Sequence, residues 1–180
     1  MSHIKIVSEK TIFKAKLFDV YETEIVLPNG EKRIHHNAKR HPTVTVFPLT
    51  QAYDIYLVSQ YRYLHKKVTI EAMAGFIDSG ETSLQAAKRE LKEETGLTAT
   101  HWEELARVEL AASVFKGTAH LFLAKGLEPG ESNPEPGEEI TIIKMSLEDA
   151  VKKVILGEIN HSASMIGILM LDRLRRKKKL

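Results

Sequence analysis

The segment 75–97, GFIDSGETSLQAAKRELKEETGL, predicts a helix with an apolar side that needs a hydrophobic core to cover it. Thr82 and Gln85 have the spacing of a capping box, which marks the beginning of a helix. Gly96 fits the residue that ends it, because glycine readily adopts the left-handed conformation found there. Apolar side chains recur at helical spacing along one side: Leu84, Ala87 and Leu91. The chain must therefore pack this face of the helix against other elements.

The same helix carries crowded negative charge at Glu90, Glu93 and Glu94. Residues three and four apart share a helix face, so Glu90 lies beside both other glutamates, while Arg89 lies beside Glu93. Like-charged pairs at this spacing cost only about 0.2 to 0.5 kcal/mol each on an exposed surface, so a solvated acidic face is one interpretation. A metal site is the other, because hard divalent cations such as Mg²⁺ prefer carboxylate oxygens.

A wider pattern favours the metal site. The fixed residues of the segment 75–97 follow the spacing G-x5-E-x7-R-E-U-x-E-E-x-G-U, where U is a bulky aliphatic residue. A chance match of all these positions in a given window is on the order of 10⁻⁹ at average residue usage. The segment resembles the box of the Nudix hydrolases. The resemblance implies an α/β (α+β) fold, an α/β/α sandwich around a mixed sheet, and hydrolysis by water of a diphosphate linked to another moiety.

The resemblance also assigns roles to residues of the box. It implies that Mg²⁺, with Mn²⁺ as a possible substitute, is held by three groups: Glu90, Glu94 and the backbone carbonyl of Ala74. Glu93 is then the partner of Arg89, and Glu81 supports the metal shell. These three residues are expected to hold the box together rather than to react.

Residues before the box narrow the resemblance to one branch. The strand end SQYR and the approach EAMAGFIDSGE are similar to the ADP-ribose and nucleoside-diphosphate-sugar pyrophosphatases. Arg62 and Glu71 are then candidates for substrate binding. Arg62 has the chemistry to face a diphosphate or to stabilise a dimer, and Glu71 to accept hydrogen bonds from a base or ribose. A surface salt bridge is the alternative for Arg62.

The acidic loop 128–139, EPGESNPEPGEE, is expected to supply the catalytic base. Its prolines, glycines and glutamates predict an exposed irregular segment. The box glutamates are occupied with metal in this interpretation, and in the resembled branch the base is a glutamate from a loop late in the chain. Glu138 is the first candidate and Glu135 the second. The alternative is that these glutamates only keep the loop solvated.

The chain is divided by its patterns into an N-terminal sheet region, 1–40, and a Nudix domain, 41–180. Alternating residues and the hairpin signal Asn29-Gly30 predict strands in the first region. Further strands are expected at 42–50, 54–62, 102–111, 117–127 and 140–145, and further helices at 146–157 and 162–179. In the resembled branch the N-terminal sheets are exchanged between two subunits, so the resemblance implies a homodimer.

Composition excludes several classes of protein. The 180 residues include no cysteine, so disulfides and thiolate metal sites are excluded, and a cytoplasmic location is expected. No apolar run approaches the roughly 20 residues that a membrane span needs. The basic tail 173–180 follows an apolar helix, where cations are favoured without any partner, so neither nucleic acid nor a membrane is expected to bind it.

The sequence is compatible with several classes of substrate. Where the ADP-ribose enzymes often have a proline beyond the box, this chain has Ser113-Val114, so nucleotide sugars such as GDP-mannose or ADP-glucose are also candidates. A nucleoside triphosphate or dinucleoside polyphosphate hydrolase is the enzymatic alternative. A non-catalytic nucleotide sensor is the alternative of another class, although such modules normally have a degraded box.

Overall fold

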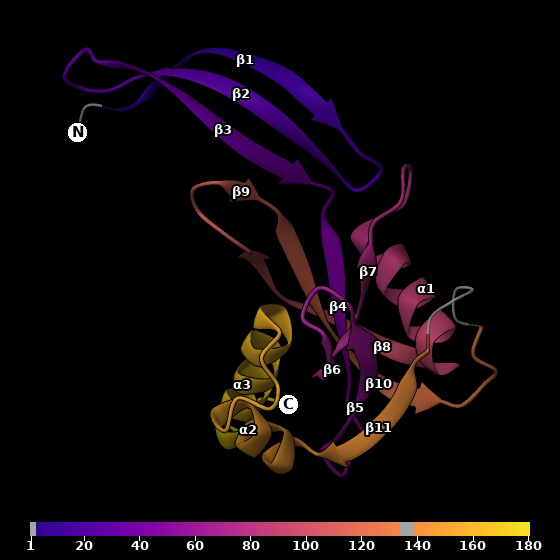
Figure 1. Ribbon diagram of the computed structural model, residues 1–180. Coiled ribbons are helices and arrows are strands. Elements are labelled where there is room, and N and C mark those ends of the chain that lie inside the picture. Colours follow the sequence, from indigo (N-terminus) through magenta and orange to yellow (C-terminus); the bar gives the residue numbers. More distant parts are fainter. Residues whose placement is uncertain (1–2, 134–138) are drawn as a thin grey trace. The chain divides into compact units, whose positions relative to one another are not determined.

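The computed structural model describes residues 3–133 and 139–180, which form two compact units (Figure 1). Of the described residues, the first unit contains 3–42 with 109–118, and the second contains 43–108 with 119–133 and 139–180. The predicted N-terminal region, 1–40, did not include the segment 109–118. This segment joins the first unit through backbone pairing, because Ala38 donates its N–H to the carbonyl of Val114 at 2.9 Å.

The first unit is a four-stranded sheet in the order β1-β2-β3-β9. Its strands are β1 (Lys5–Lys14), β2 (Phe18–Val26), β3 (Lys32–Arg40) and β9 (Phe115–Lys116). The first three are antiparallel neighbours, and β9 runs parallel to β3. At the predicted hairpin Gly30 has a φ of 85°, whereas Asn29 keeps a negative φ and accepts the N–H of Glu31 through its side chain. Only one residue of the pair therefore needs the left-handed conformation.

The second unit contains a mixed sheet in the order β7-β4-β10-β8. Its strands are β4 (Thr43–Pro48), β7 (Met73–Phe76), β8 (Thr98–Glu109) and β10 (Thr118–Glu128). Strand β4 runs parallel to β10 and antiparallel to β7. A second, antiparallel sheet has the order β11-β5-β6, with β5 (Asp54–Arg62), β6 (Lys67–Glu71) and β11 (Thr141–Ser146).

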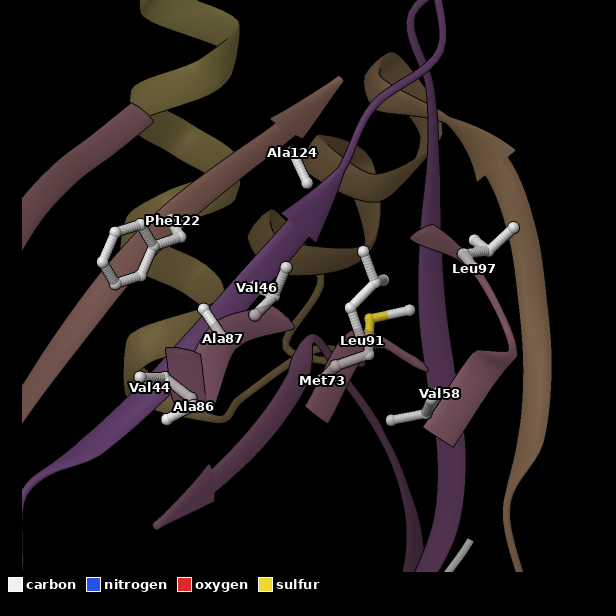
Figure 2. Packing of buried hydrophobic residues seen from close by; sticks show 10 residues of the cluster. All are labelled: Val44, Val46, Val58, Met73, Ala86, Ala87, Leu91, Leu97, Phe122 and Ala124. Carbon is white, nitrogen blue, oxygen red and sulfur yellow. The ribbon is translucent and has the colours of Figure 1, made fainter. Parts of the chain in front are cut away.

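Helices α1 (Ser83–Thr95) and α3 (Ser162–Arg176) pack against β4, which explains why every residue of this strand is buried. Helix α2 (Leu147–Ile155) packs against α3, β5 and β11. Figure 2 shows Val44 and Val46 of β4 in one apolar cluster with Ala86, Ala87 and Leu91 of α1. On the other face, a Cβ atom added to Gly167 of α3 would overlap the ring of Phe47. The predicted α/β architecture with helices on both sides of a mixed sheet is confirmed.

The limits of α1 follow the predicted signals. The side chain of Thr82 accepts the N–H of Gln85 at 3.2 Å, and Gln85 Oε1 accepts the N–H of Thr82 at 2.8 Å. Gly96 ends the helix with a φ of 72°. The acidic residues therefore lie on a helix whose beginning and end are both fixed.

None of the helices within 3–133 and 139–180 has the length and apolar character that crossing a bilayer requires.

Candidate active site

Glu90 lies directly against the backbone of strand β7. A Cβ atom added to Gly75 would overlap the Glu90 carboxylate, so any other residue here would require this carboxylate to move. The close approach of Glu90 thus gives a steric reason for glycine at the first position of the box, which the spacing of the sequence did not provide. Because Ala74 precedes Gly75, its carbonyl belongs to the same short stretch of backbone that the carboxylate approaches.

Three glutamates, Glu81, Glu90 and Glu93, lie around the guanidinium of Arg89. Its Nη1 donates to Glu90 Oε1 at 2.6 Å and to Glu93 Oε2 at 3.0 Å. Its Nε and Nη2 each donate to one oxygen of Glu81 at 3.1 Å, and Nη2 also donates to the carbonyl of Phe76 at 2.9 Å. The hydrogen bonds with Glu81, followed by those with Glu90 and Glu93, raise the pKa of Arg89 against the effect of its partial burial. One cation therefore offsets the repulsion among three carboxylates.

The predicted partnership of Glu93 with Arg89 appears in this network, whereas Glu81 has a more direct part than the sequence suggested. Both oxygens of Glu81 bind Arg89, and Oε2 also accepts the N–H of Asp78 at 3.2 Å. The hydrogen bonds from Arg89 hold the pKa of Glu81 below its ordinary value. Glu81 therefore fixes Arg89 to the loop before the helix.

The donors predicted to hold a metal are oxygen atoms from three places. Glu94 is 7% exposed, one helical turn after Glu90, and Ala74 lies in β7 opposite Thr45 of β4. Among residues 3–133 and 139–180, no three aspartate, glutamate or histidine side chains are grouped to hold an ion. Two carboxylates and a backbone carbonyl nevertheless match the preference of a hard divalent cation that keeps several waters.

The second predicted pair, Arg62 and Glu71, forms a bidentate ion pair. Arg62 Nε donates to Glu71 Oε1 at 3.1 Å and Nη2 donates to Oε2 at 2.7 Å. The hydroxyl of Thr69 also donates to Oε1 at 2.6 Å. Burial alone would raise the pKa of Glu71, but these hydrogen bonds and the nearby charges of Arg62 and His161 hold it below its ordinary value. Glu71 is 5% exposed, and both of its carboxylate oxygens accept hydrogen bonds from protein donors.

The late acidic loop begins beside the end of α1. Gly96 and Gly130 approach so closely that a Cβ on Gly130 would lie 2.8 Å from the carbonyl oxygen of Gly96. Asn133 donates its N–H to the carbonyl of Glu93 at 3.0 Å. On the other side of the loop, Glu139 lines a pocket with residues of β5. The candidate bases Glu135 and Glu138 lie outside the described residues.

Sequence reasoning missed several residues around Glu71. They are Thr69, two residues before Glu71 on the same face of β6, and His161 and Ser164 at the beginning of α3. The alternation of β6 offered a signal for Thr69. No local spacing could reveal His161 or Ser164. The hydroxyl of Ser164 accepts the N–H of Ala72, which lies 92 positions earlier in the chain.

Comparison with known proteins agrees with this architecture. The NUDIX domain model matches residues 39–164. The chain is 30% identical over 170 residues to the "ADP-ribose pyrophosphatase" of Bacillus subtilis, covering 93% of this chain and 92% of that protein. It is 29% identical over 171 residues to the "Methanol dehydrogenase activator" of Bacillus methanolicus, with the same two coverages.

A solved structure shares the fold. It is described as "Crystal structure of ADP compounds hydrolase", has a TM-score of 0.87 and 21% sequence identity, and covers 100% of this chain and 98% of its own. At this identity the likeness concerns the fold alone. The matched family model spans most of the chain and includes the acidic helix with its glycine, arginine and glutamates, so this protein belongs to the NUDIX domain family.

Proposed function

We propose that this protein is a metal-dependent pyrophosphatase of nucleoside diphosphate sugars of the ADP-ribose and GDP-mannose types. It would cleave the diphosphate to a nucleoside monophosphate and a sugar phosphate. The observation that carries this proposal is the Glu90 carboxylate seated on Gly75 and held by Arg89. The similarity over nearly the whole chain to a relative named "ADP-ribose pyrophosphatase" supports the substrate class.

The proposed metal ligands are Glu90, Glu94 and the carbonyl of Ala74. A bound Mg²⁺ or Mn²⁺ would neutralise charge on the diphosphate and lower the pKa of an attacking water. The protein itself would orient the oxygen atoms that are proposed to bind the metal. Gly75 admits the carboxylate of Glu90, and Arg89 fixes its direction through one oxygen. A carboxylate has about four acceptor sites on its two oxygens, so this hydrogen bond is compatible with metal binding.

Arg62 is proposed to face the diphosphate, and Glu71 to hold Arg62 in place. The side chain of Arg62 is 40% exposed, whereas that of Glu71 is 6% exposed. A bidentate partner fixes the plane of a guanidinium, which is the property needed to bind phosphate oxygens in one orientation. Direct binding of a base or ribose by Glu71 is the alternative, in which a substrate group would use the acceptor capacity that Arg62 and Thr69 leave.

Glu138 is proposed as the base that takes a proton from the attacking water, with Glu135 as the second candidate. Support comes from residues on both sides of the segment 134–138. Asn133 is bonded to the carbonyl of Glu93 on the acidic helix, and Glu139 lies beside β5.

A homodimer with exchanged N-terminal sheets is also proposed. The first unit leaves large apolar side chains exposed, among them Ile6 at 68%, Phe13 at 55% and Ile34 at 61%. Exposed apolar side chains gathered on one sheet favour a partner surface. The exchange itself is inferred from the resemblance.

A substrate panel tests the reaction. Purified protein with Mg²⁺ or Mn²⁺ is incubated with ADP-ribose, ADP-glucose, GDP-mannose, ATP and a dinucleoside polyphosphate, and products are separated by ion exchange. We expect a nucleoside monophosphate and a sugar phosphate from at least one nucleotide sugar. Glu90→Gln, purified identically, controls for contaminating hydrolases. Cleavage of ATP alone would contradict the proposed substrate class, and binding without cleavage would indicate a sensor.

Replacing the proposed base tests its role. Glu138→Gln is expected to lower kcat about a hundredfold or more, because general-base catalysis typically contributes about 10² to 10⁴. KM should change little, since the substrate contacts remain. Glu131→Gln is the control that removes a charge from the same loop and should keep kcat. Near-wild-type turnover of Glu138→Gln would move the role to Glu135 or to a residue of the box.

Sedimentation equilibrium tests the dimer. The protein should have about twice the 20.3 kDa mass of its chain at micromolar concentration. Ile34→Glu should weaken association, because it places a charge in the proposed apolar interface. Leu156→Glu, at a residue 72% exposed in the other unit, is the matched control. A wild-type protein that sediments as a 20.3 kDa monomer would rule out this assembly.

A further inference from the structure

The chain changes sheets at Ala72. Glu71 is the last residue of β6 and pairs with Val58, whereas Met73 is the first residue of β7 and pairs with Val46. Ala72 lies between the two strands and is 1% exposed. A buried backbone N–H at such a point needs an acceptor from elsewhere, because a missing partner costs the full desolvation of the group.

Ser164 supplies that acceptor. Its Oγ accepts the N–H of Ala72 at 2.9 Å, and its side chain is fully buried in the first turn of α3. The Oγ also lies 2.8 Å from Nδ1 of His161. His161 occupies the N-cap position of α3 without making a side-chain cap, so its imidazole engages Ser164 instead of the helix end. The hydroxyl is therefore fixed from two directions.

Groups with proposed roles lie on both sides of this contact. Glu71, which holds Arg62, directly precedes Ala72. Ala74, whose carbonyl is a proposed metal donor, follows two positions later. His161 is close enough to Glu71 for its charge to favour the ionised carboxylate. The backbone at Ala72 thus sets the distance between the group proposed to face the diphosphate and a group proposed to hold the metal.

We infer that Ser164, oriented by His161, is a positioning residue for hydrolysis, because it fixes the backbone where the chain passes from β6 to β7. The inference rests on the proposed function. It gives α3, far from the box in sequence, a part in the geometry of the site. Without the hydroxyl, Ala72 shifts to find another partner, and Arg62 and Ala74 no longer keep the same separation.

The test compares Ser164→Thr with Ser164→Val. Threonine and valine have the same shape, so the cost of extra volume is common to both and only the hydroxyl differs. Each variant is examined for Mn²⁺ affinity by electron paramagnetic resonance without substrate, for kcat and KM, and for Tm. Ser146→Ala is the control, since Ser146 also accepts a backbone N–H, that of Asp149 at 3.0 Å, but at the beginning of α2.

We expect Ser164→Val to bind Mn²⁺ about tenfold more weakly than Ser164→Thr and to have a kcat about tenfold lower, as for other residues that orient metal ligands. KM should change less than kcat. Ser146→Ala should lower Tm while keeping the Mn²⁺ affinity and kcat of the wild type. A purely structural hydroxyl would change Tm alone.

Equal Mn²⁺ affinity and equal kcat in the threonine and valine variants would overturn the inference. If neither branched variant folds, Ser164→Ala is compared with the wild type by the same measurements. Equal Mn²⁺ affinity and equal kcat in these two proteins would then overturn the inference. A wild-type protein that binds Mn²⁺ but cleaves no nucleotide sugar would contradict the proposed function. The Mn²⁺ affinities of the variants would then still decide the role of Ser164.

Discussion

The hydrogen bonds between Arg89 and three carboxylates determine the arrangement of the candidate site. Glu81, Glu90 and Glu93 all bind one guanidinium, which also donates to the carbonyl of Phe76. Without this cation, a helix with neighbouring glutamates would face repulsion along one side. With it, the carboxylates are drawn inward, and the helix is tied to the strand and loop that precede it.

The same network is compatible with the proposed metal site. Arg89 donates to Glu90 at Oε1, while Glu93, Glu81 and the carbonyl of Phe76 accept its other hydrogen bonds. Glu94 is buried one helical turn after Glu90. Glu81 and Glu93 bind Arg89, and the proposal assigns Glu94 to the metal. Glu90 has both roles, because one of its oxygens accepts a hydrogen bond from Arg89.

Local patterns in the sequence were sufficient for the helices, for the longer strands and for contacts within one helix, whereas the short strands β6, β7 and β9 were not among the predicted strands. The capping box and Gly96 predicted the limits of α1, and the spacing of Arg89 and Glu93 predicted their ion pair. The mixed sheet with helices on both faces was also predicted. These features depend on periodicity and on neighbours three or four residues apart, which a sequence displays directly.

Contacts between distant segments were not predictable in the same way. The overlap that excludes a side chain at Gly75, the bond from Ala72 to Ser164, and the joining of 109–118 to the first unit all depend on tertiary packing. Glu71 illustrates the difference. Its motif suggested a carboxylate that accepts hydrogen bonds from a base or ribose, and the fold also places Arg62 against both of its oxygens and Thr69 against one.

The central claim is that the carboxylate seated on Gly75 binds a divalent metal. Titration of the wild type and Glu90→Gln with Mn²⁺, followed by electron paramagnetic resonance without substrate, tests it directly. Glu103→Gln, which changes an exposed glutamate of β8, controls for the loss of one negative charge. The account predicts that only Glu90→Gln loses affinity, by about tenfold or more. Equal Mn²⁺ affinity in all three proteins would contradict it.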